Sequence, residues 1–221
     1  MSSDASASST LRQQLRSHLD ADSCAWLDKA LASIAEQPFA EARALNAFAL
    51  AARKLRGAGG LAAASLPEAL RALPDTGAGA LARMVLVTAA VDASGAAAPV
   101  LVAELFRQGD SDEKCAVLRA LPLLDDPERF VDVAVNACRS SVQPVFEAVA
   151  CDTAYAAQRF GDAAFAQMVL KALFVGVPLE RVQGLRERTN PELARMAHGY
   201  ASERRAAGRS VPEDIDRFFP R

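Results

Sequence analysis

The sequence is poor in the residues that build β-sheets. Its 221 residues include two Ile, five Thr and two Tyr, against 48 Ala and 25 Leu. Strands favour β-branched and aromatic side chains, whereas Ala and Leu are strong helix formers. The composition therefore argues against a β-sandwich or a β-barrel and predicts an all-α protein.

The sequence also lacks the common motifs that carry a cofactor, a metal ion or a nucleophile. It has no phosphate-binding loop, no dinucleotide fingerprint and no nucleophile elbow, and its two histidines are His18 and His198. Neither histidine has a metal-binding spacing, and the acidic clusters fall at helix starts, where carboxylates stabilise the helix dipole. We therefore predict no catalytic residue, no metal ligand and no cofactor.

No segment has the pattern of a signal peptide or an uninterrupted membrane span. Residues 84–103 are weakly charged, but Asp92, Gly95 and Pro99 interrupt them, which predicts two helices instead of one span. The four cysteines form no CxxC pair, which is typical of reduced thiols in a cytosolic protein. We expect a cytoplasmic protein whose polar residues 1–9 form a disordered tail.

Apolar residues recur at helical spacing along the rest of the chain, between Pro, Gly and Asp punctuation. The pattern predicts about a dozen short helices joined by short loops. The caps near Asp110 and Pro144 lie about one helical-repeat length apart. We predict one domain over residues 10–221, with a flexible point at 57–60. Its fold would be antiparallel helix pairs stacked as an irregular HEAT-like α-α superhelix, with an irregular bundle as the alternative.

Charge is distributed unevenly along the chain, although the net charge is only −2. Residues 180–209 hold seven arginines and four acids, and arginine suits carboxylates and phosphates. We interpret this segment as a solvated helix face with three candidate binding residues, Arg188, Arg195 and Arg204. The low net charge makes nucleic acid an unexpected partner.

Two polar residues interrupt the apolar run 163–174. Gln167 and Lys171 lie four residues apart, so they share one stripe of a helix that looks nearly buried. A shielded Lys171 must either extend its amine to water or meet a carboxylate. Glu147 and Asp152 are the partners that we predict.

Residues 104–209 resemble the EboA family of bacterial proteins. The phrases that carry the resemblance are LRALPLLDDPERF, SSVQPVFEAVACDTAYAAQRF and DAAFAQMVLKALFVGVPLERVQGLRERTNPELARMAHGYASERRAAGR. Asp152, Tyr155, Gln167 and Lys171 match the family pattern, whereas Thr153 and Ala166 depart from it. The resemblance implies a gene cluster with a prenyltransferase, sugar-phosphate-type enzymes and a metal hydrolase, which makes or exports a small metabolite.

Two functions remain open from the sequence. The first is a non-enzymatic scaffold or adaptor that holds the cluster-encoded enzymes or their small-molecule product. The second is a cofactor-free enzyme or small-molecule carrier with a polar pocket around Glu147, Asp152 and Lys171, in which a shielded lysine acts as a base or amine. The candidate binding residues are Glu147, Asp152, Tyr155, Gln167, Lys171, Arg188, Arg195 and Arg204.

Overall fold

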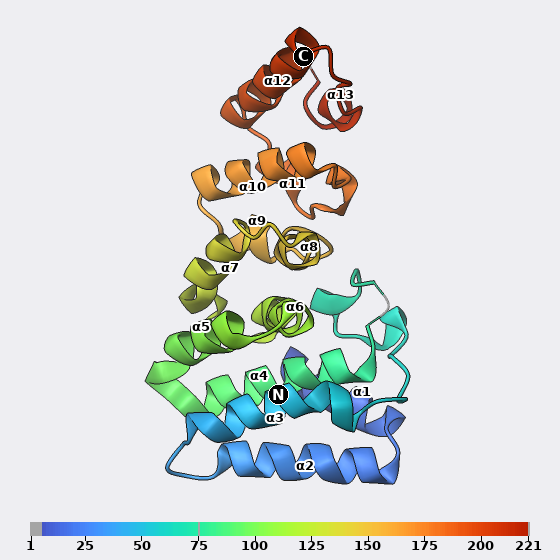
Figure 1. The fold of residues 1–221 in the computed structure, drawn as a ribbon, viewed down its shortest axis with the longest axis vertical. Coiled ribbons are helices and arrows are strands. Elements are labelled where there is room, and N and C mark those ends of the chain that lie inside the picture. Colours follow the sequence, from blue (N-terminus) through green and yellow to red (C-terminus); the bar gives the residue numbers. More distant parts are fainter. Residues whose placement is uncertain (1–5, 75, 221) are drawn as a thin grey trace, which may run out of the picture. The chain divides into compact units, whose positions relative to one another are not determined.

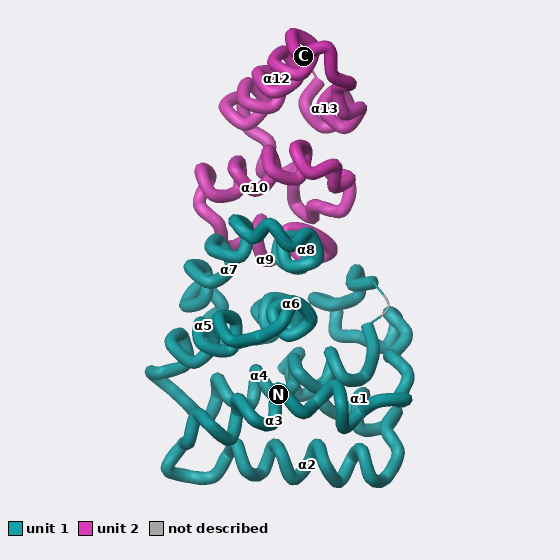
Figure 2. Tube along the Cα trace, viewed as in Figure 1, with its two compact units in different colours: residues 1–149 teal, residues 150–221 magenta. Residues whose placement is uncertain are grey.

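The fold is all-α, as the composition predicts. The computed structural model describes residues 6–74 and 76–220, and these residues contain helices and no strand. The chain divides into two compact units, residues 1–149 and residues 150–221 (Figure 2). The single domain that the sequence predicts over residues 10–221 stays a prediction. HEAT-like stacking stays a prediction.

The first unit surrounds a central apolar helix, α4 (Ala78–Ser94). This helix contacts α1, α2, α3, α5 and α6, and Figure 1 shows it among the helices of the lower part. Every residue from Leu81 to Thr88 is buried. A helix that is apolar all round belongs in the middle of a core. The other α-helices of this unit are α1 (Ala7–His18), α2 (Ala21–Ala35), α3 (Glu41–Lys54), α5 (Ala98–Gln108), α6 (Ser111–Ala120), α7 (Val131–Ala137) and α8 (Gln143–Ala150).

The helical stretch Ala78–Gln108 is the one part of the described chain that is long and apolar enough to cross a membrane, judged by length and composition. Half of its apolar window is buried inside the structure. The stretch is interrupted where the sequence predicts, because α4 ends at Ser94 and Gly95 takes a positive φ of 54°. Glycine tolerates this conformation because it has no Cβ.

A buried ion pair joins three helices of the first unit. Nη2 of Arg83, on α4, lies 2.9 Å from Oε1 of Glu113, on α6, and the two side chains are 6% and 15% exposed. Nε of Arg83 donates to the carbonyl oxygen of Phe48, on α3, at 3.2 Å. Glu113 also accepts from the backbone N–H of Asp110 in a capping box. One guanidinium therefore holds α3 and α6 against α4.

Two local predictions differ from the structure. Helix α1 begins at Ala7, inside the predicted tail, because the Ser6 side chain caps it by accepting from Ser9 N; the rest of the tail, residues 1–5, lies outside the described residues. The sequence predicts a helix between Pro67 and Pro74, but the structure has only the 3-10 turn η2 (Glu68–Leu70) there.

The second unit is smaller and consists of shorter elements. Its longest helices, α10 (Asp162–Val175) and α12 (Pro191–Ala206), contact each other. Asn190 caps α12, since its side chain accepts from Leu193 N at 2.9 Å. The remaining helices are α9 (Tyr155–Arg159), η6 (Leu179–Arg181), α11 (Leu185–Arg188) and α13 (Asp214–Phe218).

A close approach of two backbones fixes the turn between η6 and α11. Gly184 has a φ of 73°, and a Cβ built on it would lie 2.5 Å from the Cβ of Ala157 on α9. Both the positive φ and the missing side chain are therefore required here. Asp214 adds a second tie, because its carboxylate accepts from Leu179 N at 2.7 Å.

Candidate functional site

The predicted site residues Asp152 and Tyr155 lie next to the start of α9. Nη2 of Arg181 donates to Oδ2 of Asp152 at 2.6 Å, and the Asp152 backbone N–H donates to Arg181 O at 2.8 Å. The Tyr155 ring is 3% exposed and meets Phe160 edge-on, with ring centroids 6.4 Å apart. Asp152 is thus held in a reciprocal pair with Arg181, and Tyr155 belongs to the core.

Sequence reasoning missed Arg181 as the partner of Asp152. The two residues are 29 positions apart, so no local spacing connects them. The only signal in the sequence is the arginine excess of residues 180–209, which does not single out Arg181.

The predicted pairing of Lys171 with Glu147 or Asp152 stays a prediction. Glu147 Oε1 accepts from Nε2 of Gln143 at 2.7 Å, one turn earlier on α8. Lys171 is half-buried, whereas Gln167 is exposed. Helix α10 is also less buried than its apolar sequence suggests, because Phe174 is 70% exposed.

Arg188 is the most connected of the three predicted arginines. Its guanidinium donates to the carbonyl oxygens of Ala157 and Phe160 and to Oδ1 of Asp162, the last at 2.8 Å. It also lies 4.7 Å from the centre of the Phe165 ring. Arg188 therefore holds the end of α9 and the start of α10 to α11.

Arg195 and Arg204 make local contacts on α12. Arg195 binds the Glu192 carboxylate through Nη2 at 2.6 Å, and this contact lowers the pKa of Glu192. Arg204 lies over the Tyr200 ring at 5.7 Å and donates to the Ser210 carbonyl oxygen. Each predicted arginine thus has its own partners, so the three do not form a shared anion site.

A groove of about 600 Å³ lies between the N-terminal halves of α10 and α12. Its apolar lining includes Ala166 from α10 and Leu193 and Met196 from α12. Binding sites for small organic molecules commonly measure about 300–1,000 Å³ and combine an apolar lining with a few polar groups. The full lining is Asp162, Ala163, Ala166, Gln167, Asn190, Pro191, Glu192, Leu193 and Met196.

The polar groups around this groove carry no unpaired charge. Asp162 is paired with Arg188, and Glu192 is paired with Arg195. The amide of Gln167 has no hydrogen-bond partner among residues 6–74 and 76–220, and Asn190 uses its Oδ1 as the helix cap. The groove therefore offers amide hydrogen bonds and an apolar surface, and of the predicted site residues it includes Gln167.

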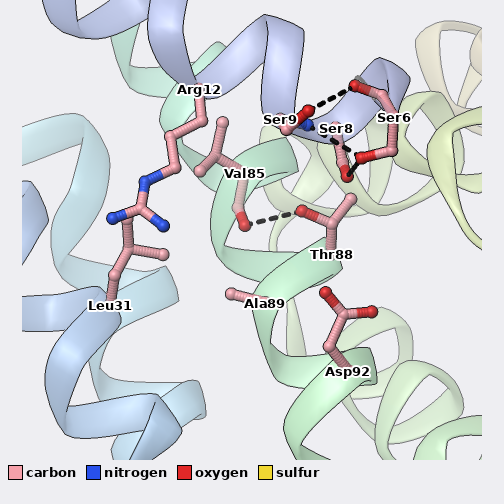
Figure 3. A pocket seen from close by; sticks show the side chains of 9 residues that line it. All are labelled: Ser6, Ser8, Ser9, Arg12, Leu31, Val85, Thr88, Ala89 and Asp92. Carbon is pink, nitrogen blue, oxygen red and sulfur yellow. Dashed lines mark hydrogen bonds between the residues drawn. The ribbon is translucent and has the colours of Figure 1, made fainter. Parts of the chain in front are cut away.

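A smaller cleft of about 190 Å³ lies in the first unit, between the start of α1 and α4. In Figure 3, Thr88 of α4 lies between Asp92 and the serines at the start of α1, whereas Arg12 extends toward Leu31. Partial desolvation, with repulsion from Asp125, raises the pKa of Asp92. The volume of this cleft falls below the usual range of small-molecule sites.

Comparison with known proteins gives one result. The model of a protein family described as "Metabolite traffic protein EboA" matches residues 7–219. The chain belongs to the EboA family. The match extends the resemblance from residues 104–209 to both units. No curated protein and no solved structure matches the chain. Within the described chain, no group of three or more His, Cys, Asp or Glu is arranged to hold a metal ion.

Proposed function

We propose that this EboA protein is a non-enzymatic scaffold or adaptor in metabolite traffic. It would act in the bacterial cytoplasm with the enzymes of a metabolite biosynthesis or export cluster. The family description supports a role in metabolite traffic, since the family model matches nearly the whole chain. Packed helices present exposed faces on which partner proteins can dock, which supports the adaptor role.

The observation that carries the proposal is the chemistry of the α10–α12 groove. It has the volume of a small-molecule site, but amides and paired ions surround it. Acid–base catalysis needs a group whose proton can be taken or given at the reacting atom. Amides and charge-paired carboxylates are suited to holding a molecule, so this groove favours binding over catalysis.

The alternative is a cofactor-free enzyme or carrier that uses Glu147, Asp152 and Lys171. The Asp152–Arg181 pair disfavours it, because Nε and Nη2 of Arg181 already bind the Asp152 carboxylate. The same contact is an ordinary structural tie between η6 and the start of α9.

Affinity purification of the tagged protein from its native host tests the proposal. Mass spectrometry should find cluster-encoded proteins and a small molecule in the eluate. Recovery of neither, under conditions that preserve the folded protein, would contradict the function. If the purified protein turned over a cluster metabolite and Asp152→Asn abolished that turnover, the protein would be the cofactor-free enzyme and not an adaptor.

A further inference from the structure

The groove between α10 and α12 contains the only functional candidate, Gln167, that is exposed, unbonded within the described chain and beside a cavity. Its apolar surface comes from both helices, with Ala166 and Leu193 as buried residues and Met196 half-buried. Methionine adapts its shape to irregular apolar partners. Burying an apolar ligand here removes water from the apolar surfaces of both the ligand and the groove, which favours binding.

The charges around the groove define the ligand further. Arg188 is held by two backbone carbonyl oxygens as well as by Asp162, so it is not available to a new anion without loss of those bonds. Glu192 receives two hydrogen bonds from Arg195, at 2.8 and 2.6 Å. An anionic or cationic ligand would therefore find no unpaired counter-charge, and its desolvation would go uncompensated.

We propose that the α10–α12 groove binds an uncharged amphipathic small molecule. Its apolar part would lie on Ala166, Leu193 and Met196, and its hydrogen-bonding group would meet the side-chain amides of Gln167 and Asn190. This proposal rests on the proposed metabolite-traffic function and names its ligand class and its site.

The test uses two fluorescent probes that share one skeleton and differ in charge. N-phenyl-1-naphthylamine is neutral and has one N–H donor, and 8-anilinonaphthalene-1-sulfonate adds a sulfonate. Both gain fluorescence in apolar sites, so each can be titrated against the full-length protein. The neutral probe should bind at least about tenfold more tightly than the sulfonate. Equal or tighter binding of the sulfonate would overturn the uncharged ligand class.

A pair of matched variants locates the probe. Ala163 is exposed at the start of α10 and lines the groove, so Ala163→Phe should fill it and leave the core unchanged. Ala206 is exposed at the end of α12 and serves as the control. Ala163→Phe should weaken N-phenyl-1-naphthylamine at least about tenfold, and Ala206→Phe by less than about twofold. Equal affinities of both variants and the unmodified protein would place the probe elsewhere and overturn the proposal.

Size-exclusion chromatography of the same proteins examines the other occupant of an apolar groove, a second copy of this chain. A dimer that Ala163→Phe dissociates and Ala206→Phe preserves would assign the groove to self-association. The experiment separates an error in the binding site from an error in the metabolite-traffic function. If Ala163→Phe still co-purifies with the host small molecule, the site is wrong and the function stands.

Discussion

The first unit packs around its longest helix, the apolar α4, whereas side-chain contacts at helix ends join the helices of the second unit. In the first unit, Arg83 is 6% exposed and joins Glu113 across a core. In the second, Arg188 is 23% exposed and binds the carbonyl oxygens at the end of α9. Arginine at helix ends satisfies backbone groups that a helix leaves unpaired. This arrangement leaves the facing surfaces of α10 and α12 with room for a groove.

Arg83→Met should have the largest effect, because it leaves the Glu113 carboxylate shielded and unpaired. The expected cost is about 3–5 kcal/mol of unfolding free energy. Denaturant unfolding measures the cost, and amide exchange should accelerate in residues 6–149. The double change with Glu113→Gln should recover part of it. Arg107→Met is the control, since that arginine is 70% exposed in its pair with Glu104. Equal unfolding curves for the two single variants would refute a buried tie in the first unit.

Gly184→Ala should be the strongest single change in the second unit. It adds a Cβ at a φ of 73°, and that atom would meet Ala157 at 2.5 Å. The left-handed conformation costs about 1–2 kcal/mol, and overpacking adds about 1–3 kcal/mol. Gly208→Ala separates the two causes, because Gly208 has a φ of 67° and open space around it. Amide exchange should accelerate in residues 150–221 for Gly184→Ala. If Gly184→Ala lowered the unfolding free energy no more than Gly208→Ala does, α9 and the turn would be able to move apart to admit the Cβ.

Lys171→Met tests the lysine pairing that the sequence predicts. The methionine keeps the stem but leaves a carboxylate without its partner, so the cost should exceed the roughly 1 kcal/mol of exposed ion pairs. The double change with Glu147→Gln should restore part of the lost stability. Lys29→Met, at an exposed position of α2, is the control. Unchanged unfolding of Lys171→Met would identify Lys171 as a surface residue that extends its amine to water.

Asp92→Asn should have the smallest effect. The raised pKa of Asp92 means that its ionised form is disfavoured in the folded protein. Ionisation of Asp92 therefore lowers stability as the pH rises through the unfolded-state pKa, near 3.8, toward the folded value. The substitution should raise the melting temperature slightly at pH 7 and leave it unchanged at pH 3, where Asp92 is protonated in both states. A lower melting temperature at pH 7 would mean that the Asp92 carboxylate makes a stabilising contact.

Helix starts were predictable where one residue carries the signal. Asn190 before Pro191 predicted α12, and Asp110 with Glu113 predicted α6, because cap and helix are neighbours in the chain. The segment between Pro67 and Pro74 was predicted wrongly. Proline supplies a helix start but donates no hydrogen bond, and the short segment between the two prolines forms only a 3-10 turn.

The site was less predictable than the helices, because its contacts join distant parts of the chain. Gln167 is a polar interruption of an apolar helix, and in the structure it lines a groove. The facing residues Leu193 and Met196 belong to α12, so no local spacing connects them to Gln167. The partners of Asp152 and Arg188 are set by tertiary packing, so no local spacing could have identified them.

We propose above that the second unit binds the metabolite in the α10–α12 groove. Small-molecule mass spectrometry of protein purified from the native host tests it most directly, with the unmodified chain, Ala163→Phe and Ala206→Phe compared at equal amounts. We expect an uncharged amphipathic compound with the unmodified chain and with Ala206→Phe, and its loss from Ala163→Phe. Equal recovery of that compound from all three proteins would show that the groove does not bind it.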